Sequence, residues 1–197
     1  MTRRARSDMI EETRGKLIEA ARRAFGEEGY AGTSMDTFTA SAGLTRGALY
    51  HHFGDKKGLL LAVAETIDAE MDLRLAAITE SDPDIWRGFL HRCRAYLEMA
   101  LEPEIQRIVL RDAPSVLGAA YTQASQRQCL TSLAEILSRL MAQGVIDQGD
   151  PDIIARLING ALVEAALWIG EGDAPEGRFA SVARNVERLL SGLKARH

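Results

Sequence analysis

The chain has 197 residues, which is long enough for one medium domain or two small ones around a real apolar core. Its 46% apolar and 26% charged residues are ordinary for a soluble globular protein. The net charge is −4, but residues 1–57 carry ten Lys/Arg against eight Asp/Glu, and the remainder carries fourteen against twenty. The positive charge is therefore concentrated in the N-terminal part of the chain, as expected if that part binds nucleic acid.

Several classes of protein are excluded by simple patterns. The only cysteines, Cys93 and Cys129, form no C-x-x-C pair, so neither a zinc site nor a disulfide framework is indicated. The basic residues Arg3, Arg4 and Arg6 are followed by charged residues instead of an apolar signal segment. No apolar stretch is long enough to span a bilayer. We therefore expect a cytoplasmic protein without a membrane partner.

The first predicted element is a long helix from near Asp8 to just before Gly29, preceded by a basic arm of residues 1–7. Asp8 and Glu11 have the spacing of a helix start. Apolar residues then recur at helical spacing and predict a buried stripe, formed by Ile10, Leu17, Ala21, Ala24 and Phe25.

The next stretch, residues 33–60, predicts two short helices joined by a glycine turn. Thr33 or Ser34 can cap the first helix, with Asp36 in the position of a capping-box partner, and Gly43 can adopt the positive φ of a tight turn. Thr45 caps the second helix, which turns Ala48 and Leu49 inward. Its outward residues are Thr45, Arg46, Gly47, Tyr50, His51 and His52. This pattern is typical of a helix-turn-helix.

The run A-G-L-T-R-G-A-L-Y-H-H-F-G-D-K-K-G-L, from Ala42 to Leu59, resembles the signature of the tetracycline-repressor (TetR-like) family of bacterial transcriptional regulators. The resemblance implies that Tyr50 and Lys56 clamp phosphates, with packing or a solvated charge as the alternative. Arg46 can donate two hydrogen bonds to guanine. Lys57 can add a phosphate contact, and the arginines of the arm can enter a minor groove. The complete set of predicted DNA-binding residues is Thr33, Ser34, Thr45, Arg46, Gly47, Ala48, Tyr50, His51 and Lys56.

Helices alone are expected in the rest of the chain. A fourth should run from Asp55-Lys56 to about Thr79, and Asp82-Pro83 should open a fifth. Glu102-Pro103 opens a short helix that Pro114 ends. The further predicted helices span residues 115–143, 151–169 and 179–193. The predicted fold is all-α, with a three-helix DNA-binding domain in residues 1–55 and a ligand-binding and dimerisation domain in residues 56–197.

The last two predicted helices favour a homodimer. The penultimate helix is apolar almost all round, so it must be covered on two sides. The final helix repeats apolar residues at steps of three and four, as the seam of a bundle does. The resemblance also implies a four-helix interface made by two helices of each subunit. The alternative is the ordinary core of a monomer.

A ligand pocket among the middle helices is implied by the resemblance. Its candidate lining residues are Trp86, Phe89, Cys93, Tyr96, Met99, Arg111, Tyr121, Gln128, Cys129, Glu164 and Trp168. Core packing is the alternative for each aromatic residue. Glu164 shares a stripe with apolar residues and needs a partner, either Arg94 or Arg111 within the fold or a cationic ligand.

We interpret the chain as a ligand-responsive transcriptional regulator. Repression is favoured, because a dimer over a promoter blocks polymerase without further apparatus. It would bind a palindromic double-stranded DNA operator and be released by a small-molecule effector. The alternative is a helical module that senses a small molecule or partner without touching DNA. An enzyme is disfavoured, since there is no H-x-x-x-H spacing, glycine-rich phosphate loop or G-x-S-x-G; no cofactor or metal is expected.

Overall fold

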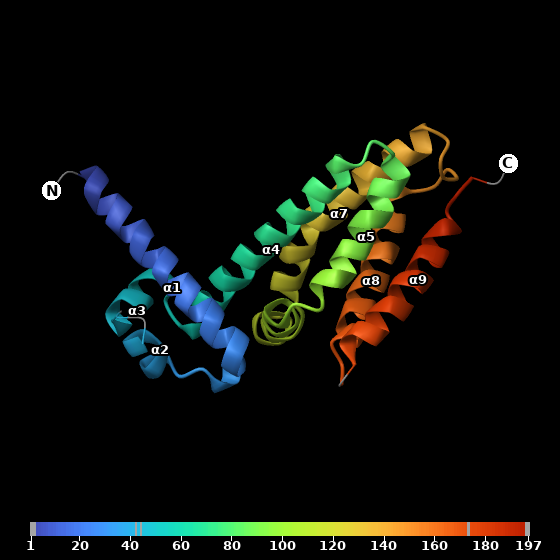
Figure 1. Cartoon of the computed structure of the whole chain (residues 1–197). Helices are drawn as coiled ribbons and strands as arrows, with labels where there is room; N and C mark the ends of the chain where they lie inside the picture. The colour runs from blue at the N-terminus through green and yellow to red at the C-terminus, as the bar shows by residue number, and fades with distance from the viewer. Residues whose placement is uncertain (1–2, 42, 44, 173, 196–197) are drawn as a thin grey trace.

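The computed structural model describes residues 3–41, 43, 45–172 and 174–195. Within these ranges the chain is helical, and its one β-type contact is an isolated bridge between Ile146 and Lys194. The predicted all-α fold is confirmed. Figure 1 shows α1–α3 at one end, the bundle of α5, α7, α8 and α9 at the other, and α4 running between them. Among the described residues, no helix combines the length and apolar character that a membrane crossing requires.

The N-terminal end contains α1 (Arg3–Gly32), α2 (Met35–Ser41) and α3 (Arg46–Phe53). Helix α1 begins at Arg3 and not near Asp8, because residues 3–7 contain no helix breaker and good helix formers continue the turn outward. Gly29 has a φ of 77° and interrupts the helix, one turn before its end. The core of this end contains Leu17, Ala21 and Phe25 of the predicted stripe, with Leu49 from α3. Ile10, which the same stripe placed in the core, is 40% exposed.

Helix α4 (Lys56–Ser81) starts where predicted, with the Asp55 carboxylate accepting from the Gly58 amide at 2.7 Å. Helix α5 (Ile85–Met99) differs from the prediction, because its cap is Asp84 and not Asp82. Asp84 accepts from the Arg87 amide at 3.0 Å, whereas Asp82 ends α4 and binds the Arg87 guanidinium. Pro83 thus lies between the two helices.

The middle of the chain departs furthest from the prediction. Residues Ile105–Asp112 form a π-helix, η1, which continues into α6 (Ala113–Leu117). Pro114 does not end a helix; it lies just after the junction of η1 and α6. Gly118, with a φ of 80°, then separates α6 from α7 (Ala119–Ala142), so the single helix predicted for residues 115–143 is divided.

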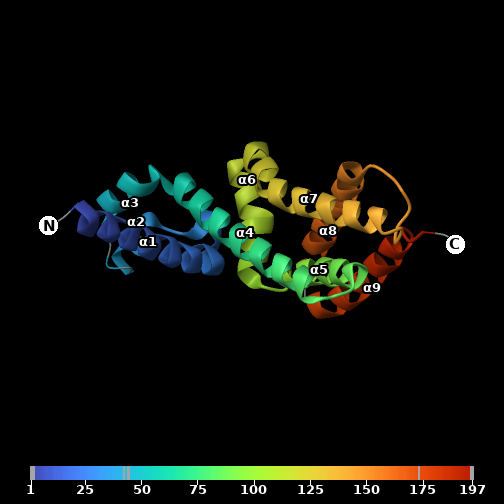
Figure 2. The same ribbon diagram turned by 90° about the horizontal axis from the view of Figure 1, so that it is seen from above.

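Helices α8 (Pro151–Ile169) and α9 (Pro175–Ser191) complete the C-terminal bundle. Asp150 caps α8 as predicted, with its carboxylate 3.0 Å from the Asp152 amide. Helix α9 begins four residues before Phe179, because Pro175 occupies its first turn. From above, the molecule is elongated, with the helix-turn-helix at one end and the bundle at the other (Figure 2).

Candidate DNA-binding surface and ligand cavity

The outward face of α3 is fixed by one cap and one buried leucine. The Thr45 hydroxyl oxygen accepts from the Ala48 amide at 3.1 Å, and Leu49 packs into the core. Helical geometry then leaves Arg46, Gly47 and His51 exposed, and Tyr50 is 52% exposed. Ala48 is half-buried beside them. The predicted recognition residues thus gather on one face of a short helix.

Arg46 is paired with α2 in the structure. Its Nε lies 2.7 Å from Asp36 Oδ1, and both side chains are exposed. Asp36 therefore pairs with the recognition helix instead of completing a capping box. An exposed ion pair contributes at most about 1 kcal/mol, so the guanidinium can exchange Asp36 for a base or a phosphate at small cost.

Thr33 and Ser34, two of the predicted contact residues, precede α3 along the chain. Thr33 is only 4% exposed, and its hydroxyl donates to the Gly29 carbonyl at 2.8 Å. Its side chain is part of the core and does not face outward, a correction that follows from the interruption of α1 at Gly29. Ser34 is exposed, with its Oγ 3.5 Å from the Thr37 amide at the start of α2. The side chains of the predicted arm residues Arg3, Arg4 and Arg6 lie outside the described part of the chain.

Lys56 is half-buried and already has two partners. Its ammonium donates to the Thr33 carbonyl at 2.7 Å and lies 4.5 Å from the centre of the Tyr30 ring. These contacts join the start of α4 to the segment between α1 and α2. The neighbouring Lys57 is exposed. Lys56 would have to leave its carbonyl partner to reach a phosphate, whereas Lys57 would not.

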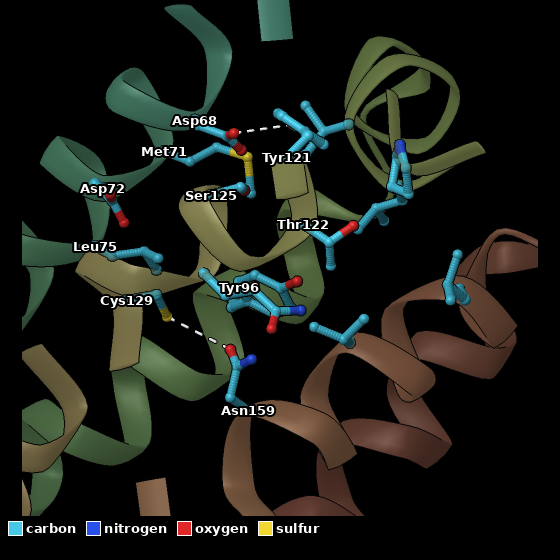
Figure 3. Close-up of a pocket in the computed structure, with 16 residues that line it drawn as sticks. Asp68, Met71, Asp72, Leu75, Tyr96, Tyr121, Thr122, Ser125, Cys129 and Asn159 are labelled. Carbon is cyan, nitrogen blue, oxygen red and sulfur yellow. Dashed lines mark hydrogen bonds between the residues drawn. The ribbon is translucent and has the colours of Figure 1, made fainter. Parts of the chain in front are cut away.

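A cavity of about 190 Å³ lies between α4, α5, η1, α6, α7 and α8 (Figure 3). Most of its wall is apolar, and its polar groups come mainly from α4 and α7. The lining residues are Asp68, Met71, Asp72, Leu75, Tyr96, Val109, Leu110, Pro114, Tyr121, Thr122, Ser125, Gln126, Cys129, Asn159, Val163 and Leu167.

The polar groups of the cavity are linked in two short networks. The Tyr121 hydroxyl donates to Asp68 Oδ2 at 2.9 Å, and Ser125 also hydrogen-bonds this carboxylate. The Cys129 thiol donates to Asn159 Oδ1 at 3.6 Å. Burial raises the pKa of Asp68, and the hydrogen bonds from Ser125 and Tyr121 oppose this rise. Burial also raises the pKa of Asp72, with the charge of Arg92 acting in the opposite direction.

The predicted ligand residues divide into two groups. Tyr96, Tyr121 and Cys129 line the cavity. The others do not: Trp86, Phe89 and Cys93 pack in the bundle core with residues of α7, α8 and α9. Met99 is also buried, and Gln128 is exposed outside the cavity.

Arg111, Glu164 and Trp168 also lie outside the cavity. The Arg111 guanidinium donates to the Gly170 carbonyl at 3.1 Å, and Trp168 is 50% exposed. Glu164 is exposed on the same side of α8, and the described residues give it no ion pair; Arg94 lies against the Phe179 ring instead. The predicted pairing of Glu164 with Arg94 or Arg111 is therefore not formed in the described part of the chain, where its side chain is exposed.

The sequence reasoning missed the two carboxylates of the cavity. Asp68 and Asp72 are four residues apart, so they lie one above the other on the α4 face that also carries Met71 and Leu75. The signal was present, because charged residues on an apolar stripe need a reason.

The cavity and the DNA-binding end meet at η1. Arg22 of α1 donates to both Glu70 of α4 and Glu104, which precedes η1, at 2.7–2.9 Å. The Tyr30 amide donates to the Asp112 carboxylate at 2.7 Å. On its other side, η1 supplies Val109 and Leu110 to the cavity wall. One eight-residue segment therefore contacts both sites.

An exposed apolar face covers part of α8 and α9. Leu157 is 69% exposed and Leu189 is 72% exposed, with Ile153 and Trp168 also exposed on α8. A groove between the two helices is almost entirely apolar and includes Leu157, Ile158, Ala161, Leu162, Val186, Leu189, Leu190 and Leu193. This is the face that the sequence pattern assigned to the dimer.

Known proteins agree with this arrangement. Residues 17–63 match the family model of bacterial regulatory proteins, tetR family, and residues 86–193 match the tetracyclin repressor-like C-terminal domain. The crystal structure of a TetR-family transcriptional regulator from Pectobacterium atrosepticum is 56% identical, covers 100% of this chain and 99% of its own, and superposes with a TM-score of 0.88.

Two curated relatives are more distant. The transcriptional repressor AcnR of Corynebacterium glutamicum is 34% identical over 110 residues, which are 55% of this chain and 56% of that relative. The alignment thus spans little more than half of AcnR. The TetC protein of transposon Tn10 from Escherichia coli is 26% identical over 179 residues, 89% of each chain. Together with the helix-turn-helix, these matches show that the chain belongs to the TetR family of bacterial regulatory proteins.

Proposed function

We propose that the protein is a repressor that binds a palindromic operator as a homodimer and is released when a small molecule occupies the cavity. In this proposal residues 1–55 bind DNA, residues 56–197 bind the ligand and the second subunit, and the protein acts in the cytoplasm, where its operator is. The observation that carries the proposal is the exposed face of α3, with Arg46, Tyr50 and His51 held outward by the buried Leu49.

Each exposed residue has a role that suits its chemistry. Arg46 exchanges Asp36 for a guanine and reads sequence, while Thr45 and His51 donate to a base or phosphate. Gly47 lets the backbone approach closely. Tyr50 and Lys57 hold phosphates, and Ser34 contributes at the start of α2. Lys56 stabilises the motif through its hydrogen bond to the Thr33 carbonyl, and it can contact a phosphate only after this bond is broken.

The homodimer forms through α8 and α9. Their exposed leucines and the apolar groove between them support this assignment, because a monomer would leave this face in water. A two-fold dimer presents its recognition helices to neighbouring major grooves, about 34–36 Å apart, and hence selects a palindrome.

Release requires that the ligand change this separation. Helix α4 starts in the helix-turn-helix and carries Asp68, Asp72 and Leu75 of the cavity wall, while η1 connects the same wall to α1. A tilt of α4 that displaces its DNA-binding end by a few ångströms would move both recognition helices out of register with the two major grooves.

Selection of the operator from random double-stranded DNA, followed by fluorescence anisotropy at increasing salt, tests the proposal. We expect a palindrome and a steep loss of affinity with salt, with a slope of about −0.9 per phosphate contact. Arg46→Ala should relax sequence choice at one position of each half-site, whereas Lys57→Ala should weaken all sequences alike and reduce the slope by about one.

A protein that selects no sequence and shows no salt-dependent affinity would instead be a sensing module without DNA-binding activity. A reporter gene placed behind the selected operator distinguishes repression from activation, since deletion of the regulator should raise expression and not lower it.

A further inference from the structure

The cavity carries an unusual charge for a site whose wall is mostly apolar. Its wall contains two carboxylates, Asp68 and Asp72, and no Lys, Arg or His among the lining residues. Arg92, which is buried, stands behind Asp72 and Cys129 and offsets part of this charge. Asp68 has only neutral partners among the described residues, the hydroxyls of Tyr121 and Ser125. One negative charge in the cavity is therefore without a counter-charge.

A carboxylate removed from water favours its neutral form, which is why the pKa of Asp68 is raised. Keeping the Asp68 carboxylate ionised in the ligand-free cavity costs free energy, and a bound cation would offset this cost. A divalent metal is a poor candidate, because no group of three or more acidic, histidine or cysteine side chains comes together in the described part of the chain.

The other residues of the cavity wall indicate what the uncharged part of such a cation should be. Met71, Leu75 and Leu167 offer apolar surface, and the Tyr96 and Tyr121 rings can face a positive charge. The cavity volume of about 190 Å³ is below the range of drug-sized sites, about 300–1,000 Å³, so the ligand must be compact.

Asn159 adds a second, independent observation. It is only 6% exposed and lines the cavity from α8, opposite Asp68, as Figure 3 shows. Its Oδ1 accepts from Cys129, while its amide nitrogen has no partner among the described residues. This donor remains available to a ligand in the cavity, where an oxygen acceptor would take its hydrogen bond.

From these contacts we propose that the effector is a compact organic amine in its ammonium form, with an apolar body and an oxygen acceptor at its far end. The ammonium lies between Asp68 and Asp72, and the acceptor receives the Asn159 amide. The proposal rests on the proposed function only for the consequence of binding; the binding itself can be measured without DNA. Both carboxylates belong to α4, so the ligand would act directly on the helix that leads to the recognition motif.

The test is isothermal titration calorimetry of the full-length protein at neutral pH. The probes are alkylammonium and phenylalkylammonium ions from butyl to decyl, each plain and with a terminal methoxy group. Every ammonium is matched by the alcohol and the carboxylate of the same length. Among them, ammonium ions should bind at least about tenfold more tightly than their alcohols, because a charged hydrogen bond is stronger than a neutral one. The methoxy-tipped forms should bind more tightly than the plain ones.

Asp68→Asn and Asp72→Asn should each remove most of the preference for ammonium over alcohol. The asparagine at position 68 keeps a side-chain oxygen for the hydrogen bonds from Tyr121 and Ser125. Glu80→Gln, an exposed charge loss on the same helix, should leave the preference unchanged. Thermal unfolding confirms that each variant is folded.

Alcohols or carboxylates that bind as tightly as the ammonium ions would overturn the proposal. So would the absence of binding by any ammonium ion, or a preference that survives both asparagine variants. Operator selection with the ligand-free protein is a separate measurement. If the protein selects no operator but still prefers ammonium ions, the proposed repressor function is refuted and the proposed ligand class is retained. If it selects an operator but shows no preference for ammonium ions, the ligand class is refuted and the repressor function is retained.

Discussion

Leu157 and Leu189 offer a quantitative test of the dimer face. They are 69% and 72% exposed in the single subunit, so most of each side chain remains to be buried by a partner. Full burial of a leucine contributes about 1.5–3 kcal/mol, so the buried share of each is worth about 1–2 kcal/mol. A two-fold dimer contains each leucine twice. Replacing both by alanine should therefore cost at least about 4 kcal/mol, which raises the dimer Kd about a thousandfold.

Sedimentation equilibrium over a wide concentration range measures this change. Leu73→Ala is the matched control, since Leu73 is also 72% exposed but lies on α4, away from the groove. Leu190 is unsuitable, because it is buried inside the subunit and its replacement would report on folding. A double alanine variant that dimerises as tightly as wild type, or a control that dissociates equally, would refute the assignment of α8 and α9.

Two further predictions concern stability. Lys56→Met should lower the free energy of unfolding by about 1–2 kcal/mol in denaturant titrations, because it removes a charged hydrogen bond to the Thr33 carbonyl. The exposed neighbour gives the control: Lys57→Met should change stability by less than about 0.5 kcal/mol, and an equal loss in both would contradict the structural role of Lys56. Asp68 has a pKa raised in the folded state, so its contribution to stability falls as pH rises above the unfolded value, about 3.9. Asp68→Asn should therefore raise the Tm at pH 7 and have little effect near pH 3; a lower Tm at pH 7 would contradict this sign.

The N-terminal motif was predictable because its signals are local. Thr45 caps α3, Leu49 is buried and Asp55 caps α4, each through contacts within a few residues. The same holds for Asp150 and α8. Position within the motif does not reveal long-range contacts, however. Nothing in the sequence near Lys56 indicates that its ammonium meets the Thr33 carbonyl, twenty-three residues earlier.

The middle of the chain was harder, because tertiary packing decides its backbone. A π-helix carries no sequence signature of its own, and η1 forms where Ile105, Ile108 and Val109 must face the core while Asp112 reaches α1. Gly118 could have been recognised as a break, but apolar residues continue in register on both sides of it. A pocket among the middle helices was predicted, but most of its lining residues were not, because its wall combines six segments that are distant in sequence.

The strength of the ion pairs that join α1 to α4 and to the residue before η1 bears on how a ligand could release DNA. Arg22 is partly exposed and binds Glu70 and Glu104, which are also partly exposed. Each such pair contributes at most about 1 kcal/mol. The coupling free energy between two allosteric sites is typically about 1–3 kcal/mol.

The two quantities are of the same size, so a ligand that repositions Val109 and Leu110 of η1 can exchange these ion pairs for others without unfolding either end. A ligand shifts a conformational equilibrium only by its difference in affinity for the two states. The cavity therefore needs a contact that differs between the states, and the uncompensated carboxylate on α4 is the group best placed to provide it.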